Sequence, residues 1–382
     1  MTVGIDIRVL GSRTKSGIEE YTENLLSQLI PLDPSIKYKL FYSSLRNNLP
    51  SYEWLSFDNV EVKKFRWPNK MLFTSARFFN RPYIDELLGG VDVFFSPHFF
   101  LAPLSWKCKR VTTIHDLSFI RFKEFFSWRK IAWHRLEMNP LEQCKLSDLI
   151  ITVSESTKKD LENLFNIDPQ KISVVPSGID SHITRPSEDE LNKFRREKNL
   201  PHNFILSLGK IEPRKNILGL IRAFNKLKET NKFLDLNLVI IGARGWLYHD
   251  VFKESKKSRY SKNIIFTSYI NDNEKRYYYS LANCFVYPSF FEGFGFPNLE
   301  AMICGTPVVT SNSSSIPEVV GNGPILINPN SVGEIAQAIT NILVDTKLSK
   351  SVVSGGLLIA KKYDWKASAI KTMELITRIS NV

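Results

Sequence analysis

Cysteine is scarce and dispersed in this chain of 382 residues, because Cys108, Cys144, Cys284 and Cys304 form no CxxC pair. No His-rich segment accompanies them, which argues against a structural zinc site. Long apolar runs are also missing, since no stretch reaches the roughly 18 uninterrupted apolar residues that span a bilayer. The amino terminus, MTVGIDIRVL, lacks the basic and apolar regions of a secretory signal. We therefore expect a reduced, cytoplasmic chain.

The overall composition is that of an ordinary globular protein, with 43% hydrophobic and 24% charged residues. This excludes a disordered chain, a collagen and a coiled coil. The length suggests two domains, at roughly 100–200 residues each. The 51 basic and 39 acidic residues give a formal net charge of +12. Such a surplus favours an anionic partner or merely aids solubility, and it does not choose between nucleotide, phospholipid and nucleic acid.

Short β-rich runs alternate with helical patterns along almost the whole chain, which is typical of parallel α/β sheets. A polar, charge-dense stretch, 181–201, interrupts the alternation and looks like a connection between domains. One helix is predicted from Ile18, Tyr21, Leu25 and Leu29, a second from the start signal Thr157 and Asp160, and a third from Ile217, Leu220, Phe224 and Leu227. The predicted strands are 3–10, 91–97, 111–116, 149–154, 172–178, 204–210, 236–243, 263–270, 284–289 and 306–312.

A final amphipathic helix, about 365–380, has no strand after it and must dock on structure already formed. The expected fold class is α/β, with two Rossmann-like, doubly wound domains facing each other across a cleft. We place the first domain at 1–184, the second at 185–362 and the closing helix at 363–382. In such folds ligands bind outside the carboxyl ends of the strands.

The most informative segment is FFEGFGFPNLEAMICGTPVV, in which seven residues separate Glu292 from Glu300. Gly293, Gly295 and Pro297 lie between them, after a strand and before a predicted helix. Glycines let backbone N–H groups approach an anion, and a helix start adds about half a positive charge. Such a loop predicts a binding site for a diphosphate, with two carboxylates that can accept hydrogen bonds from sugar hydroxyls. Taken alone, such a glutamate pair is more often structural.

This segment resembles the retaining GT-B glycosyltransferases of family 4, whose signature is E-x7-E. The shared pattern is A-x3-V-x-P-S-x2-E-G-F-G-x-P-x-L-E-A-M, beginning at Ala282, and it continues through Ser311, Ser314 and Glu318. The resemblance spans nearly the full chain. It implies an acceptor-binding first domain, a second domain that binds a nucleotide sugar, a last helix that returns to the first domain, and retention of the anomeric configuration.

The resemblance also implies roles for particular residues. Glu292 would hold hydroxyls of the donor sugar and Glu300 the ribose, while Phe294, Gly295 and Phe296 would lie against the donor. In SLGKIEPRKNILGL, a basic pair stands between a strand and a helix, where cations can reach anionic oxygens. Such a pair on its own is usually only solvated. In the family it holds the donor diphosphate and supports the departing nucleotide, and here it falls on Arg214 and Lys215.

Two positions in the first half complete the expected site. Gly17 lies where relatives use a glycine-rich turn to touch the donor phosphate, although this chain has Ser16 in place of a second glycine. His115 ends a predicted strand within VTTIHDLSF. A His–Asp pair suggests acid–base chemistry, whereas the matching histidine of the family positions the transferred sugar. His98 is interpreted either as packing or as part of the acceptor site.

The chain contains no D-x-D triplet, the carboxylate pair with which sugar transferases of the other major fold hold a divalent ion. Arg214 and Lys215 would supply the positive charge instead. We therefore expect no metal and no cofactor, with the nucleotide sugar as substrate.

Two segments interleave basic and aromatic side chains. Residues 63–83 hold six basic and six aromatic residues and no acid, and residues 121–135 hold one acid. Such segments suit an anionic membrane surface or a lipid-phosphate acceptor, although part of them will be ordinary core. We expect peripheral contact with the cytoplasmic face of the inner membrane.

The stretches TIHDLSF, DLIITVSESTKKDL, ISVVPSGID and EGFGFP are similar to bacterial mannosyltransferases that use GDP-mannose to build surface polysaccharides. The expected acceptor is a saccharide or a lipid-linked saccharide in O-antigen, capsule or exopolysaccharide synthesis. A UDP-sugar donor, glucosyl or N-acetylglucosaminyl, is the leading alternative. A sugar-nucleotide epimerase and a basic nucleic-acid-binding protein are the others, and no nucleic-acid-binding motif appears.

Overall fold

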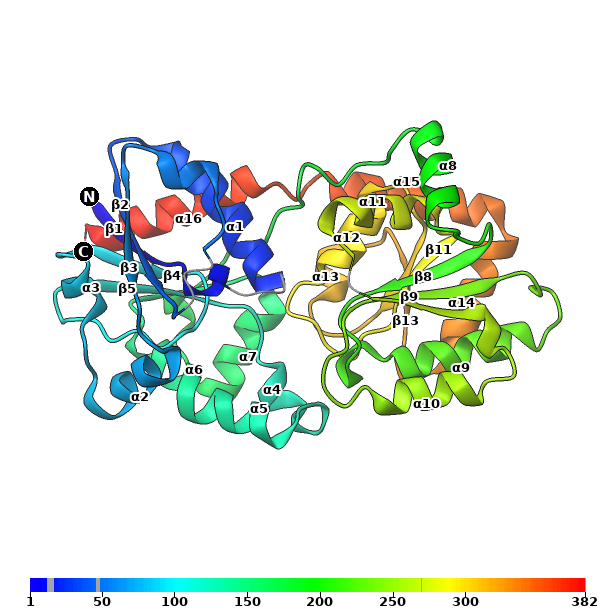
Figure 1. Ribbon diagram of the computed structural model, residues 1–382, viewed down its shortest axis with the longest axis horizontal. Helices are drawn as coiled ribbons and strands as arrows, with labels where there is room; N and C mark the ends of the chain where they lie inside the picture. Colours follow the sequence, from blue (N-terminus) through cyan, green and yellow to red (C-terminus); the bar gives the residue numbers. More distant parts are fainter. Residues whose placement is uncertain (12–16, 46–48, 269, 382) are drawn as a thin grey trace. The chain divides into compact units, whose positions relative to one another are not determined.

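The computed structural model describes residues 1–11, 17–45, 49–268 and 270–381, and the chain forms two compact units (Figure 1). Unit 1 comprises Met1–Arg121, Trp128–Gly178 and Asp364–Val382, and unit 2 comprises Phe122–Ser127 and Ile179–Tyr363. The division differs from the expected one in three respects. The boundary lies at residue 178 instead of 184, the closing segment begins at Asp364 instead of residue 363, and a short segment of the first half belongs to unit 2.

The described part of unit 1 holds one parallel sheet in the order β3-β2-β1-β4-β5-β6-β7. The order reverses between β1 and β4, which makes this pair the topological switch point of a doubly wound sheet. The strands are β1 (Thr2–Asp6), β2 (Lys37–Ser43), β3 (Val60–Phe65), β4 (Val93–Ser96), β5 (Lys109–Ile114), β6 (Leu149–Thr152) and β7 (Ile172–Val174).

Helices α1 and α16 pack together and cover one face of this sheet. Both match the sequence prediction: Tyr21, Leu25 and Leu29 of α1 are buried, and α16 begins at Trp365 after the capping side chain of Asp364. The helices of unit 1 are α1 (Gly17–Leu29), α2 (Asn69–Phe79), α3 (Ile84–Leu87), α4 (Ser118–Arg121), α5 (Trp128–Trp133), α6 (Pro140–Leu146), α7 (Glu155–Phe165) and α16 (Trp365–Ser380), with a π-helical turn at His134–Met138.

The start of α7 corrects a sequence prediction. Thr157 and Asp160 do not begin this helix, because Ser154 caps it by accepting a hydrogen bond from the Thr157 backbone N–H. Thr157 instead donates its hydroxyl to the carbonyl of His115, and Asp160 pairs with Arg121. The pattern was correct for a helix, but a competing serine three residues earlier satisfies the first free N–H groups.

The described part of unit 2 holds a second parallel sheet, in the order β10-β9-β8-β11-β12-β13. Its switch point lies between β8 and β11, because the connections on either side of this pair run in opposite directions along the sheet. The strands are β8 (Phe204–Leu208), β9 (Asn237–Ile241), β10 (Ile264–Thr267), β11 (Cys284–Tyr287), β12 (Val308–Ser311) and β13 (Ile325–Ile327).

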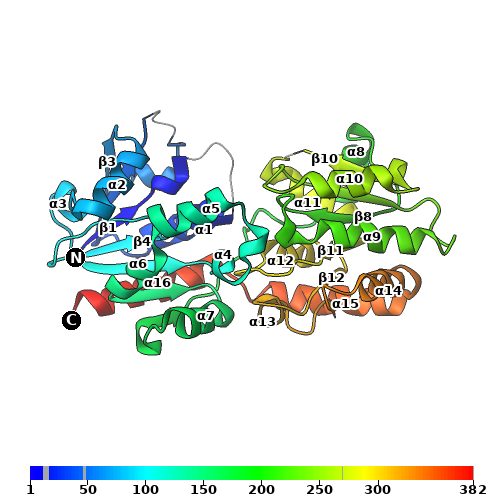
Figure 2. The same ribbon diagram turned by 90° about the horizontal axis from the view of Figure 1, so that it is seen from below.

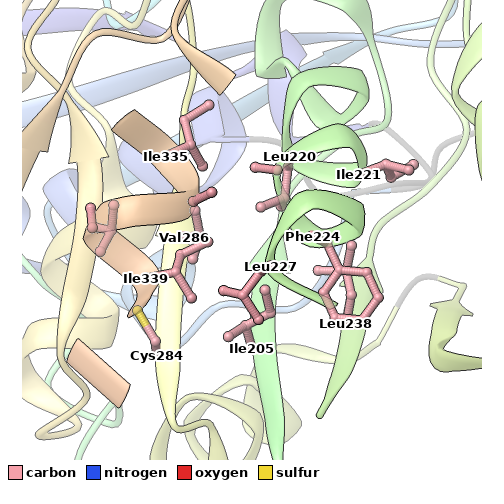
Figure 3. Packing of buried hydrophobic residues seen from close by; sticks show 14 of the residues in the cluster. Ile205, Leu220, Ile221, Phe224, Leu227, Leu238, Cys284, Val286, Ile335 and Ile339 are labelled. Carbon is pink, nitrogen blue, oxygen red and sulfur yellow. The ribbon is translucent and has the colours of Figure 1, made fainter. Parts of the chain in front are cut away.

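The core of unit 2 lies between this sheet and helices α9 and α14 (Figure 3). Leu220, Phe224 and Leu227 of α9 face the buried strand residues Ile205 and Val286, as the helical spacing predicts. The helices of unit 2 are α8 (Glu188–Glu197), α9 (Ile217–Lys228), α10 (His249–Lys257), α11 (Asp272–Leu281), α12 (Phe296–Ile303), α13 (Ile316–Val320), α14 (Val332–Val344) and α15 (Thr346–Ala360) (Figures 1 and 2).

The charge-dense stretch 181–201, interpreted as a connection, contains helix α8 of unit 2. Ser187 and Glu190 form a capping box at its start, and Phe194 stacks on Tyr277 of α11 with ring centroids 4.6 Å apart. Only one narrow side of α8 is apolar, so its composition resembles that of a linker although the capping signal was present.

Three strands escaped the sequence prediction, namely β2, β3 and β13. β2 begins by alternating lysine with apolar residues, whereas β3 has three charged residues among six and lies at the edge of its sheet with no buried position. A half-exposed edge strand lacks the continuous apolar run of a central parallel strand.

None of the described helices combines the length and apolar character needed to cross a bilayer.

Gly242, directly after β9, is held where no other residue fits. Its φ is +156°, and an added Cβ would lie 1.9 Å from the carbonyl oxygen of Gly209, directly after β8. We expect Gly242→Ala to lower the free energy of unfolding by about 2 kcal/mol through overpacking, measured by urea titration. Gly333→Ala in α14 is the control, since its Cβ would meet nothing closer than 3.6 Å. Equal stability of the two variants would contradict the expectation.

Candidate active site

The loops that follow β8 and β11 bring three predicted residues together at the switch point of unit 2. Arg214 and Lys215 lie in a 3-10 turn after β8, and Glu292 lies in the loop after β11. Adjacent parallel strands place their carboxyl ends at the same edge of a sheet, where doubly wound folds bind ligands. Lys215 and Glu292, which are 77 residues apart in the sequence, are therefore in direct contact.

Glu292 forms an ion pair with each of the two cations. Nη1 of Arg214 donates to Oε2 of Glu292 at 2.8 Å, and Nζ of Lys215 donates to Oε1 at 2.7 Å. Arg214 also donates from Nε to Glu212 at 3.0 Å. These side chains are mostly buried, with exposed fractions of 15% for Arg214, 11% for Lys215 and 7% for Glu292. The carboxylate thus aligns both cations, a role that sequence reasoning did not give it.

Burial and charge determine the protonation of this cluster. Burial alone would raise the pKa of Glu292, but the neighbouring Arg214 and Lys215 overcome it and lower the pKa to about 2. Burial lowers the pKa of Lys215, against the opposing effect of Glu292. Lys215 Nζ also donates to the hydroxyl of Tyr287 at 2.5 Å. Among the described residues these two acceptors leave one of its three hydrogens for a further anionic oxygen.

Hydroxyl groups from the next loop fix the backbone around Glu292. The N–H of Glu292 donates to the hydroxyl of Ser314, and the hydroxyl of Ser315 donates to the carbonyl of Glu292, both at 2.9 Å. Ser313 donates to the carbonyl of Phe290 at 3.0 Å. The serines after β12 therefore determine the path of the loop that carries Glu292.

The loop ends at Gly295, which precedes helix α12. Its φ of +94° is a left-handed conformation that favours glycine, and Pro297 occupies the first turn. Asn298, in the same turn, is fully buried, and neither polar atom of its amide has a partner among the described residues. Phe294 is buried against Tyr363 and Phe296 is partly exposed. Because its ring is buried, Phe294 could contact a donor only through its backbone.

Glu300 lies in α12 and faces helix α11. The hydroxyl of Tyr279 donates to its Oε2 at 2.7 Å, and Nζ of Lys275 lies 3.5 Å from its Oε1. Burial raises the pKa of Tyr279 well above its usual value, so this hydroxyl stays protonated and donates. Glu300 is buried, and each of its carboxylate oxygens has the capacity to accept a second hydrogen bond.

The remaining predicted residues, Gly17 and His115, lie in unit 1. Gly17 is exposed at the start of α1, and the neighbouring Ser16 lies outside the described residues. Nε2 of His115 hydrogen-bonds the carbonyl of Pro97 at 2.8 Å, so Nε2 carries the hydrogen and Nδ1 is the acceptor in the neutral ring. Gly17 and His115 belong to unit 1, and their roles in the site stay predictions.

Three partly or fully buried histidines of unit 1 make its stability depend on pH. Burial lowers the pKa of His98 well below its usual value, and it also lowers those of His115 and His134. Below about pH 6.5 these histidines therefore bind protons in the unfolded chain but stay neutral in the folded protein, so the free energy of unfolding falls. We expect a lower thermal midpoint at pH 5.5 than at pH 7.5.

Substitution separates these histidines from other acid effects. His98→Asn should reduce the loss of stability between pH 7.5 and pH 5.5, because its imidazole is buried beside His115. His182→Asn is the matched control at an exposed position. The measurement is thermal unfolding at both pH values. A pH-independent midpoint in the wild type would contradict the interpretation.

Four supporting residues were missed by sequence reasoning, namely Glu212, Lys275, Tyr279 and Tyr287. Glu212 stands two residues before Arg214, and Tyr287 ends the strand before the glutamate loop, so their proximity to the motifs was a usable signal. Lys275 and Tyr279 gave no such signal, since a helix distant in sequence brings them to Glu300. In the part of the chain that the structure describes, no three His, Cys, Asp or Glu side chains gather as metal ligands would.

Comparisons with known proteins agree with this fold. The family model described as Glycosyl transferases group 1 matches residues 188–356, and that described as Glycosyltransferase Family 4 matches residues 15–182. The O-antigen chain mannosyltransferase B of Escherichia coli is 32% identical over 373 residues, which are 94% of this chain and 95% of that protein.

Solved structures share the fold over the whole chain. Sucrose-phosphate synthase from Thermosynechococcus elongatus superimposes with a TM-score of 0.79 at 18% identity, covering 99% of this chain and 98% of that one. Anabaena HepE in complex with UDP and glucose has a TM-score of 0.74 at 18% identity and covers 99% and 100%. The resemblance carried by the E-x7-E segment is thereby confirmed. The chain belongs to the GT-B glycosyltransferases, with a family 4 domain in its amino-terminal half and a group 1 domain in its carboxyl-terminal half.

Proposed function

We propose that this glycosyltransferase moves mannose from GDP-mannose to a saccharide or lipid-linked saccharide, with retention of configuration, in the synthesis of a cell-surface polysaccharide. The observation that carries the proposal is the paired arrangement of Arg214, Lys215 and Glu292 at the switch point of unit 2. Similarity to the O-antigen mannosyltransferase of E. coli over 94% of the chain supports mannose and the polysaccharide.

In the proposed reaction the bond from the sugar C1 to the diphosphate breaks and a bond from C1 to the acceptor hydroxyl forms on the same face. Arg214 and Lys215 stabilise the charge that grows on the departing diphosphate. A phosphate oxygen takes the proton of the acceptor hydroxyl. Glu292 holds hydroxyls of the sugar while it keeps both cations aligned, and Glu300 holds the ribose. These roles require no metal, so EDTA should leave the rate unchanged.

The donor is tested by a thermal-shift panel of GDP, UDP, ADP and their sugars, because a ligand that binds only the folded state raises its stability. We expect GDP and GDP-mannose to give the largest shifts. A larger shift with UDP would favour the alternative, a UDP-sugar donor, for which the structural similarity to HepE with UDP and glucose is the supporting observation.

The reaction type is tested by product analysis with GDP-α-mannose and a saccharide acceptor. An α-linked product, read from the anomeric proton by NMR, is expected from retention, and a β-linked product would contradict it. Turnover of the nucleotide sugar to an epimer without any acceptor would favour the epimerase alternative instead.

Peripheral membrane contact is part of the proposal, and unit 1 offers a surface for it. Met71, Phe78 and Phe79 of α2 are 67%, 76% and 74% exposed, and Trp128 of α5 is 73% exposed. Figures 1 and 2 place α2, α5 and α6 along one face of unit 1. The exposed basic residue Lys70 lies in the first turn of α2, which suits anionic headgroups beside apolar anchors.

Vesicle sedimentation tests this surface. We expect binding to vesicles that contain anionic lipid and not to purely zwitterionic ones, with loss of binding in the double variant Phe78→Ser and Phe79→Ser. Leu358→Ser in α15 is the matched control, because Leu358 is 68% exposed on unit 2. Equal binding by both variants would contradict the assignment.

A further inference from the structure

The segment Phe122–Ser127, which we call the aromatic strap, belongs to unit 2, although the chain before and after it belongs to unit 1. Its sequence FKEFFS places two charged residues among three phenylalanines. Lys123 and Glu124 are exposed, whereas Phe126 is buried. The strap therefore directs its rings into unit 2 and its charges to solvent. The sequence suggested a membrane contact for these rings, and the structure gives them a protein partner.

Two rings of the strap pack on the loop that carries Glu292. Phe122 lies 5.6 Å from Phe291 and Phe125 stacks 5.2 Å from Phe290, centroid to centroid. Phe122 and Phe125 also stack on each other at 5.3 Å, with an angle of 6° between the rings. Aromatic pairs of this kind contribute about 0.5–1.5 kcal/mol each beyond the area they bury. The loop is thus held by the strap through two neighbouring side chains.

A third contact ties the strap to the loop after β9. Phe126 stacks on Trp246 with centroids 5.3 Å apart, and Nε1 of Trp246 donates to the carbonyl of Phe125. The preceding Gly245 donates its N–H to the carbonyl of Ile211 at 3.0 Å, in the loop after β8. The strap therefore contacts the loops after β11 and β9, and the second of these is joined to the loop after β8 by one hydrogen bond.

Phe290 and Phe291, which pack against the strap, both hydrogen-bond to Arg214. The N–H of Phe290 donates to the carbonyl of Arg214, and Nη1 of Arg214 donates to the carbonyl of Phe291, both at 2.9 Å. Glu292, which pairs with the same guanidinium, is the next residue along the chain. A shift of Phe290 and Phe291 would therefore move both members of the central ion pair.

We propose that the aromatic strap positions the glutamate loop and Arg214 for sugar transfer without itself touching the donor. This inference rests on the proposed function, because it concerns the same reaction and the same site. The serines after β12 fix one side of the loop, and the strap fixes the other through Phe290 and Phe291. Displacement of catalytic groups by about 1 Å can lower a rate about a hundredfold, so loss of a holding contact acts mainly on turnover.

The experiment compares Phe125→Ala with Phe125→Tyr in steady-state kinetics of the full chain with donor and acceptor. We expect Phe125→Ala to lower kcat about tenfold and to raise the donor KM by a smaller factor, about threefold, because Arg214 is displaced but still present and Glu300 and its partners lie outside the strap's contacts. Phe125→Tyr keeps the ring and should restore kcat. Hydrogen exchange should become faster at the amide of Phe290, which bonds to Arg214 in the wild type.

Phe233→Ala is the matched control, since Phe233 is also a half-buried phenylalanine of unit 2 and packs on its core instead of the loops. If Phe125→Ala folds poorly, Trp246→Phe tests the same strap, because it removes the hydrogen bond to Phe125 and keeps a ring. Phe125→Ala and Trp246→Phe should each lower kcat, whereas Phe233→Ala should not.

The possible results distinguish a failure of the strap proposal from a failure of the proposed function. Slow turnover in Arg214→Ala together with a normal kcat in Phe125→Ala would contradict the strap proposal and leave the proposed function of the site unaffected. Equal losses of kcat in Phe125→Ala and Phe233→Ala would also overturn it, because general destabilisation would then explain both. Normal turnover in Arg214→Ala would contradict the proposed function of the site, and the positioning role of the strap would then be contradicted as well.

Discussion

The Arg214→Ala and Lys215→Ala variants should each turn over at least about a hundredfold more slowly than the wild type. The departing diphosphate gains charge in the transition state, and these two side chains are the cations fixed at the switch point of unit 2. Removing one preorganised electrostatic group commonly lowers a rate by two to three powers of ten. The measurement is kcat with saturating donor and acceptor.

Two further variants keep this prediction specific. Arg214→Lys retains the charge but loses the fork that reaches Glu212, Phe291 and Glu292, so it should recover only part of the rate. Arg222→Ala is the matched control, because Arg222 is 53% exposed on α9 and pairs with Glu254. A near-normal rate in Arg214→Ala and Lys215→Ala would remove both residues from the mechanism.

Glu300→Ala should weaken nucleotide binding by about ten- to a hundredfold. Hydrogen bonds to a charged group contribute about 1.5–3 kcal/mol, and the carboxylate of Glu300 is held in place by Tyr279 and Lys275. Isothermal calorimetry with the nucleoside diphosphate measures the effect.

A milder substitution distinguishes orientation from direct contact. Tyr279→Phe removes only the hydroxyl that donates to Glu300 at 2.7 Å, so we expect a smaller loss of affinity than in Glu300→Ala. Unchanged affinity in Glu300→Ala would contradict its assignment to the ribose, whatever the effect of Tyr279→Phe.

The sequence predicted the parts of the fold that depend on local pattern. Central strands such as β8 and β11 are continuous apolar runs, and α9 repeats its apolar residues at helical spacing, so both were visible without a structure. The edge strand β3 was not, because three of its six residues are charged and none of its positions is buried. Helix α8 was missed because its charged surface outweighed its capping signal.

The site was predictable where motifs follow strands. Arg214, Lys215 and Glu292 were singled out because such motifs resemble those of the family, and the switch point between β8 and β11 explains why they meet. The pairing of both cations with one carboxylate was not predictable, since it depends on side-chain geometry across 77 residues.

The contacts made by the strap were hidden for a similar reason. Phe125 looked like a membrane anchor because aromatic and basic residues alternate around it, and only the fold shows that it stacks on Phe290. Composition alone cannot distinguish a ring that meets lipid from one that meets another ring.

The central claim is that Arg214 and its partners hold the diphosphate of the donor. It is tested most directly by titrating GDP and GMP into the wild type and into Arg214→Ala by calorimetry. In the wild type the β-phosphate should improve affinity tenfold or more, as a charge-assisted contact does. In Arg214→Ala most of this advantage should disappear. If GDP is preferred over GMP by the same factor in both proteins, the guanidinium does not hold that phosphate and the account is contradicted.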